Sequence, residues 1–333
     1  MPIVTLPNEW YVDPAQYDVE RHAIFGRQWL FMGFDDGLQQ PGDYVARDIA
    51  GWNLLVVVDD NGELAAHHNV CRHRAGPLVT AGAGHVPSLV CRYHGWAYGL
   101  DGALRSARDF GADVECAEFG LVPVAVERWR GLVFVNLDTE SVPLATALGS
   151  FADACADFEI ERFRPCGTRD HEMQCNWKTY ADNYLEGYHV PVLHPELNKQ
   201  IESKRYHVAV DEDHRWVEQS APARDGAAVT GRWLWRWPNF ALNLYPNGVV
   251  VECIEPIAPT RTRLRYAYAF DDPASVDDSE QMRLSAVVTA EDIEICERVQ
   301  HNLASGIYRD GLLSPRHEHG VAAFQSWVRD ALR

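Results

Sequence analysis

Two histidines separated by four residues, His189 and His194, are the feature of this 333-residue sequence that points most directly to chemistry. If the preceding residues form a helix, Asp182, Glu186 and His189 occupy positions i, i+4 and i+7 and share one face. Pro191 cannot continue a helix, so we expect the helix to end near His189 and the chain to turn His194 toward the same point. Two converging imidazoles beside carboxylates indicate a metal site.

A second set of metal-binding side chains consists of two Cys–His pairs, Cys71 with His73 and Cys91 with His94. Each pair follows a β-like run and precedes turn residues, so two hairpin tips can close on one centre. Two cysteines and two histidines could hold a structural zinc ion. Zinc fingers usually pair like ligands, however, whereas each loop here carries one of each. The neighbouring His67 and His68 could also be ligands, but strand residues are the expected interpretation.

The first pattern, Cys-x-His followed by Cys-x2-His, resembles the Rieske motif that holds a 2Fe-2S cluster. The second resembles the D/E-x2-His-x4-His motif of the Rieske non-heme iron oxygenases, the large subunits of ring-hydroxylating oxygenase systems. The resemblance covers about residues 10–330 and includes Tyr93-His94-Gly95-Trp96 and Trp237-Pro238-Asn239. It implies that Cys71 and Cys91 bind one iron of the cluster, and that His73 and His94 bind the other.

The resemblance also implies a triad of two histidines and one carboxylate that holds a mononuclear Fe(II) and leaves positions open for O2. A helix late in the chain offers four carboxylates, Glu291, Asp292, Glu294 and Glu297. Asp292 lies on the apolar stripe of this helix, where an unpaired carboxylate is costly unless it binds a metal. We expect His189, His194 and Asp292 to be the iron ligands, with Glu291 as the second choice for the acid.

Glu186 and Asp182 are candidate catalytic residues. In the family, an acidic residue three positions before the first iron histidine bridges two metal centres, which implies that Glu186 links His189 to His94 of a neighbouring subunit. Most members carry Asp there, whereas some members that act on quaternary ammonium compounds carry Glu. A solvated helix glutamate is the alternative. Asp182 could support the site or line the pocket, or it could be an ordinary helix acid.

Composition limits the partners of the protein. The formal net charge of −18 argues against nucleic acid and anionic membranes as partners. The N-terminus shows no signal peptide, and the longest aliphatic runs are too short to span a bilayer, so we expect a cytoplasmic protein. Its eight cysteines should then be reduced, and a clustered pair indicates metal binding before a disulfide.

The order of helical and β-rich segments along the chain predicts an α+β protein of two domains. Residues 10–30 are expected to be helical, within an N-terminal helical segment (1–38) that packs on the catalytic domain. Short β-rich runs with turn residues predict an all-β Rieske 2Fe-2S domain over 39–140. Residues 143–158 should form a helix, strands should follow between about 206 and 270, and helices are expected from Ser279 to Ser305 and from Val321 to Leu332. The catalytic domain (141–333) is expected to be a central antiparallel sheet flanked by helices, of the START or helix-grip type.

The alternation Trp233-Leu234-Trp235-Arg236-Trp237 places three tryptophans on one strand face. They could form an aromatic box for a cation or a stacking wall for a ring, although Trp is also a common strand core residue. The adjoining family strand lines the pocket, so Phe240, Leu242 or Asn243 could face the substrate.

The resemblance implies a terminal oxygenase with one Rieske 2Fe-2S cluster and one mononuclear Fe(II) per chain, which hydroxylates an aromatic compound by mono- or dioxygenation. Oxidative demethylation or hydroxylation of a quaternary ammonium or betaine-type substrate is the alternative, and a non-catalytic metal-binding or electron-transfer protein is a third reading. No G-x-G-x-x-G or P-loop occurs, so a separate NAD(P)H reductase, with or without a ferredoxin, should supply electrons. The family implies a homotrimer, and a small β subunit remains an open alternative.

Overall fold

The computed structural model describes residues 3–110, 115–224, 231–273 and 280–333. The chain divides into two compact units, one formed by Phe25–Ala147 and the other by Met1–Ile24 together with Leu148–Arg333. Each unit has its own seven-stranded sheet. In the part of the chain that the structure describes, no helix is both long and apolar enough to cross a membrane.

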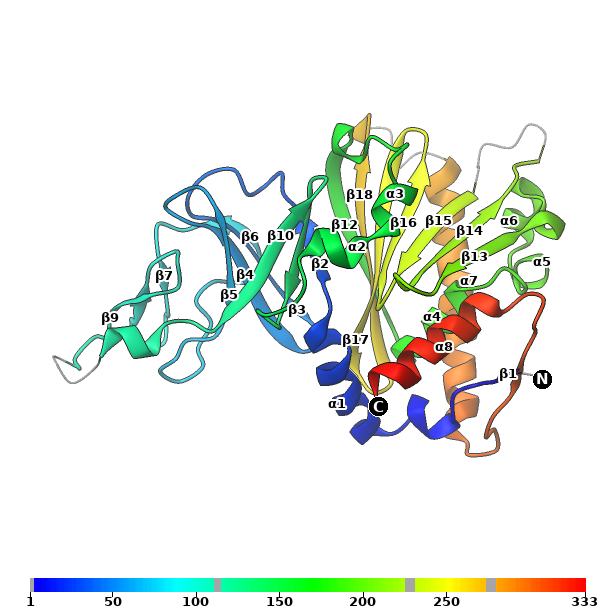
Figure 1. Ribbon diagram of the computed structural model, residues 1–333, viewed down its shortest axis with the longest axis horizontal. Coiled ribbons are helices and arrows are strands. Elements are labelled where there is room, and N and C mark those ends of the chain that lie inside the picture. Colours follow the sequence, from blue (N-terminus) through cyan, green and yellow to red (C-terminus); the bar gives the residue numbers. More distant parts are fainter. Residues whose placement is uncertain (1–2, 111–114, 225–230, 274–279) are drawn as a thin grey trace. The chain divides into compact units, whose positions relative to one another are not determined.

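The unit Phe25–Ala147 is built on an antiparallel sheet of strand order β2-β11-β10-β5-β4-β3-β6 (Figure 1). Its hairpins are closed by turns that the sequence specifies: between β4 and β5 the Asp59 carboxylate accepts the amides of Asn61 and Glu63, and Gly62 adopts φ 84°. A smaller sheet holds β7 (Leu89–Val90), β8 (Ala97–Tyr98) and β9 (Leu104–Ser106). The larger sheet holds β2 (Leu30–Phe34), β3 (Asp43–Ile49), β4 (Trp52–Val58), β5 (Leu64–His68), β6 (Gly82–His85), β10 (Pro123–Trp129) and β11 (Leu132–Asn136).

The N-terminal segment is less helical than the sequence suggests. After a 3-10 turn at Asn8–Tyr11, helix α1 covers only Pro14–Ala23, and Asp13 caps it by accepting the amide of Ala15 at 2.8 Å. A 3-10 turn at Phe25–Arg27 follows, but the predicted continuous helix to residue 30 is wrong, because Leu30–Phe34 forms strand β2 and pairs with β11. Its apolar residues therefore enter a sheet, where tertiary pairing overrides the helical pattern.

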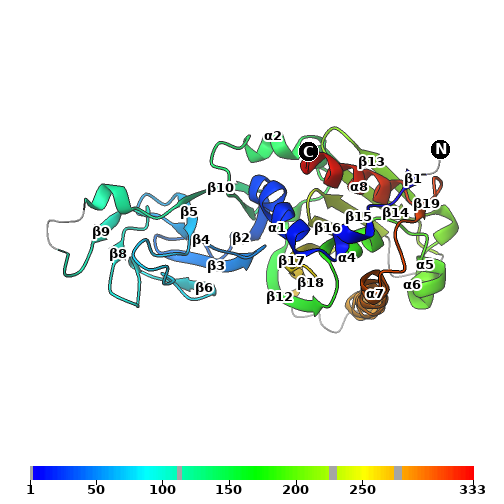
Figure 2. The ribbon, with the colours of Figure 1, turned by 90° about the horizontal axis from the view of Figure 1, so that it is seen from below.

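The unit that contains Leu148–Arg333 is built on an antiparallel sheet of order β12-β18-β17-β16-β15-β14-β13 (Figures 1 and 2). Helix α4 (Trp177–Tyr184) packs against β17, α7 (Glu280–Ala304) and α8 (His319–Ala331). The strands are β12 (Arg164–Met173), β13 (His207–Asp211), β14 (Trp216–Ala221), β15 (Gly231–Arg236), β16 (Phe240–Tyr245), β17 (Gly248–Ala258) and β18 (Arg261–Phe270). The predicted α+β fold, with a central antiparallel sheet and flanking helices, is confirmed.

Two smaller predictions need correction. The helix predicted over residues 143–158 is two short helices, α2 (Leu144–Leu148) and α3 (Ser150–Ala154). They are separated by Gly149, which has φ 50° and lies against the His214 ring, so a helix cannot pass through it. The last long helix is observed from Glu280, while its predicted first residue, Ser279, lies outside the described residues. Short strands β1 (Ile3–Val4) and β19 (Leu312–Leu313) pair with each other.

Candidate metal centres and the adjoining cavity

The segment that carries the two spaced histidines leaves its helix earlier than predicted. Asn176 caps α4 by accepting the amide of Lys178, and the helix ends at Tyr184 rather than near His189. Beyond it the Glu186 carboxylate accepts the backbone amides of Tyr188 and His189, which takes the place of helical hydrogen bonding. A new short helix, α5 (Val190–Leu193), then begins, and its Pro191 sits in the first turn, where proline is tolerated.

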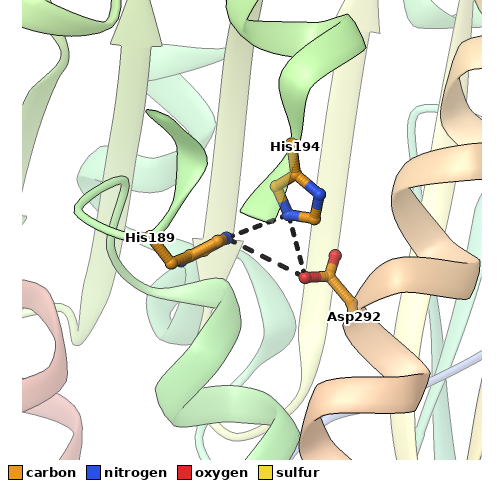
Figure 3. A group of neighbouring side chains, drawn as sticks. All are labelled: His189, His194 and Asp292. Carbon is orange, nitrogen blue, oxygen red and sulfur yellow. Dashed lines mark hydrogen bonds and ion pairs between the residues drawn. The ribbon is translucent and has the colours of Figure 1, made fainter. Parts of the chain in front are cut away.

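The two histidines converge with Asp292 of α7, as Figure 3 shows. The two Nε2 atoms of His189 and His194 lie 3.1 Å apart, and Asp292 Oδ1 lies 3.0 Å from His194 Nε2 and 3.8 Å from His189 Nε2. Among the described residues, this is the one group of three or more His, Cys, Asp or Glu side chains whose ligand atoms all lie within 4.8 Å of one another. The side chains are 21 %, 1 % and 10 % exposed for His189, His194 and Asp292, so the site is shielded from water.

The outward nitrogen of each histidine is held by a carboxylate. His189 Nδ1 lies 2.5 Å from Glu186 Oε1, and His194 Nδ1 lies 2.7 Å from Glu291 Oε2. An Nδ1–H that donates to a carboxylate leaves a lone pair on Nε2, so both histidines present lone pairs to the point where Asp292 places its oxygen. Three acceptor atoms in mutual contact repel one another unless a cation lies between them, and this donor set suits Fe(II).

The four carboxylates of α7 have different partners, according to the face of the helix on which each one lies. Asp292 is buried and also accepts Asn183 Nδ2 at 2.8 Å. Glu291, the second choice from sequence, supports His194 from behind instead of reaching the triad. Glu294 pairs with Arg298 at the surface, and Glu297 accepts the amide of Gln174. Burial lowers the pKa of His194, but hydrogen bonds and charge from Asp292 and Glu291 outweigh burial, so its pKa lies above the ordinary value.

Asp182 does not share a face with Glu186 and His189, because α4 ends between them. Its carboxylate accepts Tyr11 Oη at 2.6 Å and Gln325 Nε2 at 3.0 Å. Asp182 lines a different cavity, which α8 and the N-terminal segment also line, and so it is placed away from the triad. Burial raises the pKa of its carboxyl to about 7.

The Cys–His pairs lie in two loops that have the same backbone pattern. Cys71 donates its amide to the Gly76 carbonyl and accepts the amide of Ala75. Cys91 does the same with the residues four and five positions later, Gly95 and Trp96. Both cysteines are 2 % exposed, and the rings of His73 and His94 are 4.6 Å apart between centroids. The two loops therefore bring all four side chains to one end of this unit.

These loops have features that suit an iron–sulfur cluster. His73 Nδ1 is buried and has no hydrogen-bond partner in the part of the chain that the structure describes, as expected for a nitrogen reserved for a metal. A Cβ on Gly76 would lie 2.8 Å from Cys91 Sγ, so only glycine lets the loops approach this closely. Tyr98 Oη accepts the Arg72 amide at 3.0 Å and lies 3.3 Å from Cys71 Sγ, to which its hydroxyl can donate. His67 and His68 lie in β5 and pair with β4 as strand residues.

A cavity of about 120 Å³ opens beside the triad, in the unit that contains α4 and α7. Glu186, His189, His194 and Asp292 line it together with the sheet residue Glu252. Its remaining lining includes six aromatic rings, from Tyr180, Tyr184, Tyr206, Trp233, Tyr245 and Tyr266. The triad thus faces an aromatic cavity that can hold a small organic molecule.

The tryptophan alternation is divided between core and cavity. Trp235 and Trp237 pack against Phe324 and Trp327 of α8, whereas Trp233 lines the cavity and stacks on Tyr206 at 6.1 Å between ring centroids. Of the three candidates on the next strand, Asn243 lines the cavity, while Phe240 packs on Phe151 and Leu242 points to the opposite face of the sheet from Asn243.

Sequence reasoning missed Glu252 and Tyr206 as cavity residues. Glu252 lies in β17, opposite Ala241 and Tyr266, and is 3 % exposed. The only sequence signal is an acid within the apolar run Val249-Val250-Val251-Glu252-Cys253-Ile254, where a charged residue requires a reason.

Comparisons with known proteins agree with both halves of the chain. A family model described as the ring hydroxylating alpha subunit (catalytic domain) matches residues 160–333, and one described as the Rieske [2Fe-2S] domain matches residues 28–119. The chain is similar to the chloroplastic choline monooxygenase of Spinacia oleracea, with 31 % identity over 99 % of this chain and 78 % of that protein. It is also similar to the glycine betaine monooxygenase oxygenase subunit of Chromohalobacter salexigens, with 30 % identity over 98 % of this chain and 86 % of that one.

Among solved structures, the chain resembles a quaternary ammonium Rieske monooxygenase described in connection with carnitine oxidation and inter-subunit electron transfer. The TM-score is 0.89 and the sequence identity 26 %, over 100 % of this chain and 96 % of that one.

Proposed function

Because the chain belongs to the ring-hydroxylating oxygenase alpha subunits of the Rieske non-heme iron type, we propose that it oxidises a methylated ammonium compound with O2. It is a Rieske terminal oxygenase, and members of the family carry a 2Fe-2S cluster and a mononuclear iron. The interpretations as a structural zinc protein or a non-catalytic protein are therefore rejected. The expected aromatic substrate also gives way to its alternative, since the relatives named above act on choline, glycine betaine and carnitine.

Two sets of residues are proposed to hold the metals. Cys71, Cys91, His73 and His94 would hold the cluster, and His189, His194 and Asp292 would hold the iron. Bound Fe(II) supplies the activation of O2, and the cluster supplies electrons one at a time. The chain's contribution is to fix both histidine tautomers through Glu186 and Glu291 and to leave one side of the triad open to the cavity.

The observation that carries the choice of substrate is the aromatic lining of the cavity beside the triad. The six rings named above can surround a methylated ammonium group, whose charge interacts favourably with the faces of aromatic rings. Glu at position 186 supports the same choice, because some family members that act on quaternary ammonium compounds carry Glu at this position. The substrate methyl or methylene group next to nitrogen would lie nearest the iron ligands.

Electrons are proposed to come from a separate reductase, with or without a ferredoxin, and to cross between subunits of a homotrimer. Glu186 binds His189 through Oε1, and its bridging role would be completed by His94 of a neighbouring chain. Glu186→Ala should then leave both metals bound and slow single-turnover electron transfer. A normal transfer rate in this variant would remove the bridging role.

The test is product formation by the purified protein with a surrogate reductase and NADH, on a panel of choline, glycine betaine, carnitine and aromatic compounds. Metal analysis should give about three irons and two labile sulfides per chain. We expect a hydroxylated or demethylated product only from the ammonium compounds. His189→Ala and Asp292→Ala should keep the cluster spectrum and lose turnover. Product from an aromatic compound alone would contradict the proposal.

A further inference from the structure

Glu252 is a buried acid whose charge is not balanced by a cationic side chain. Its Oε1 accepts Tyr180 Oη and its Oε2 accepts Asn243 Nδ2, both at 3.1 Å, and both donors are neutral. No Lys or Arg among the described residues forms an ion pair with it. A carboxylate that is 3 % exposed and lacks a counter-ion is costly, and burial raises the pKa of Glu252 to about 7.

The hydrogen bonds around Glu252 are arranged for an acceptor. Tyr184 Oη donates to Asn243 Oδ1 at 2.9 Å, which orients the Asn243 amide so that its NH2 group faces Glu252. Both carboxylate oxygens therefore accept a hydrogen bond from a neutral neighbour. The carboxylate is held in place on the sheet strand β17, in the wall of the cavity.

The cavity as a whole is negative. Glu186, Glu252 and Asp292 line it, Glu291 lies directly behind His194, and no Lys or Arg is among the described lining residues. Four carboxylates beside one divalent iron outnumber its two positive charges. Such a site attracts a cationic substrate group and disfavours a carboxylate on the substrate, because no Lys or Arg of the described lining could pair with that carboxylate.

We propose that Glu252 is the counter-ion of the substrate, so that the cavity accepts an ammonium compound whose other groups are uncharged, such as an amino alcohol, and rejects betaines that carry a carboxylate. This inference rests on the proposed function and narrows it. Glu252 provides the charge, and the rings of Tyr180, Tyr266 and their neighbours provide the apolar surround for the methyl groups.

The test measures anaerobic binding to the metal-loaded protein by titration calorimetry at pH 8, with three probes. These are choline, its neutral carbon isostere 3,3-dimethyl-1-butanol, and glycine betaine. We expect wild type to bind choline roughly tenfold or more tightly than either other probe. Glu252→Gln should weaken choline binding by about the same factor and leave binding of the neutral isostere unchanged.

Two further variants separate charge from fold. Glu255→Gln alters a buried acid of the same strand, near Arg263 and outside the cavity lining, and should keep the preference for choline. Glu252→Asp keeps the charge and should retain most of the preference even if the Gln variant is poorly folded. Cluster absorbance and iron content report whether each variant is intact.

The outcomes are distinct. Equal affinity for choline and glycine betaine, or an unchanged choline-to-isostere ratio in Glu252→Gln, would overturn the role of Glu252 while oxidation of ammonium compounds still stood. Turnover of an aromatic compound alone would overturn the proposed function itself.

Discussion

At the scale of single residues, the hydroxyl of Tyr98 lies within hydrogen-bond distance of Cys71, a proposed cluster ligand. It can donate to Cys71 Sγ at 3.3 Å, because its own oxygen already accepts the Arg72 amide. A hydrogen bond to a thiolate ligand favours the reduced cluster, so Tyr98→Phe should lower the reduction potential. If the free energy of this hydrogen bond differs by about 1 kcal/mol between the two oxidation states, the reduction potential shifts by roughly 40 mV for one electron. Protein-film voltammetry measures it.

The control is Tyr44→Phe, since Tyr44 lies in the same core and its hydroxyl contacts Thr80 instead of a cysteine. The potential of that variant should equal that of wild type. Equal potentials in all three proteins would show that Tyr98 does not donate to the cluster.

Glu291 is expected to tune iron binding without being a ligand. Its carboxylate holds His194 Nδ1 at 2.7 Å and so keeps the Nε2 lone pair aimed at Asp292. Loss of a carboxylate that holds a ligating histidine typically lowers metal affinity by about 10- to 100-fold. Glu291→Ala should therefore bind iron about 10- to 100-fold more weakly, as measured by competition with a chelator. Glu294→Ala, on the same helix but paired with Arg298 at the surface, is the control. Retention of iron equal to that control would exclude the positioning role.

At the scale of elements, the sequence predicted those site residues whose placement depends on short motifs or on one helix face. The Cys–His loops and the His189–His194 spacing lie within single turns of chain, so their convergence could be predicted from pattern and resemblance. Asp292 was also predictable, because a buried helix stripe explains an acid only if it is paired. Glu252 could not be, because only the register of β17 against β16 and β18 turns it toward the cavity. That register depends on long-range pairing with no local sequence signature.

The face assigned to α4 illustrates the same limit. The i, i+4, i+7 alignment of Asp182, Glu186 and His189 assumed a helix that continues. The chain leaves the helix at Tyr184, where the Gly187 backbone lies against the ring of Tyr206. This contact and the amides that Glu186 accepts separate Asp182 from Glu186 and His189, and the helical pattern alone includes neither.

Asp182, on the side of α4 turned toward Tyr11 and Gln325, predicts a pH dependence of stability. Burial raises the pKa of its carboxyl to about 7, whereas the unfolded value is about 3.9. Between these values the folded protein holds a proton that the unfolded chain releases, so its contribution to the unfolding free energy falls as pH rises. The slope is about 1.4 kcal/mol per unit from about pH 4 to 7, with no further loss above.

Asp182→Asn removes this titration. Urea unfolding at pH 5, 6, 7 and 8 should show the variant gaining stability relative to wild type up to about pH 7, after which the difference levels off. Glu294→Gln, an exposed acid, should track wild type throughout. A difference between Asp182→Asn and wild type that stays constant with pH would mean that Asp182 is ionised in the folded protein across this range.

At the scale of the whole molecule, the two proposed sets of metal ligands lie in two separate units, Cys71 to His94 in one and His189 to Asp292 in the other. If electrons cross between chains, a subunit that lacks the cluster can be served by a neighbour that lacks the iron. Cys71→Ser should abolish the first site and Asp292→Ala the second, and each homogeneous protein should be inactive. If the protein forms the proposed homotrimer, co-expression of the two variants gives mixed trimers, which should recover activity. Random assembly in a three-fold ring places an active pairing at about one interface in four, which sets the expected fraction of wild-type turnover.

Native mass spectrometry establishes the composition of the trimers, and the cluster spectrum per chain establishes that the Asp292→Ala subunits are loaded. Mixed trimers of verified composition that remain inactive would place the electron path within one chain, and Glu186 would then serve His189 alone.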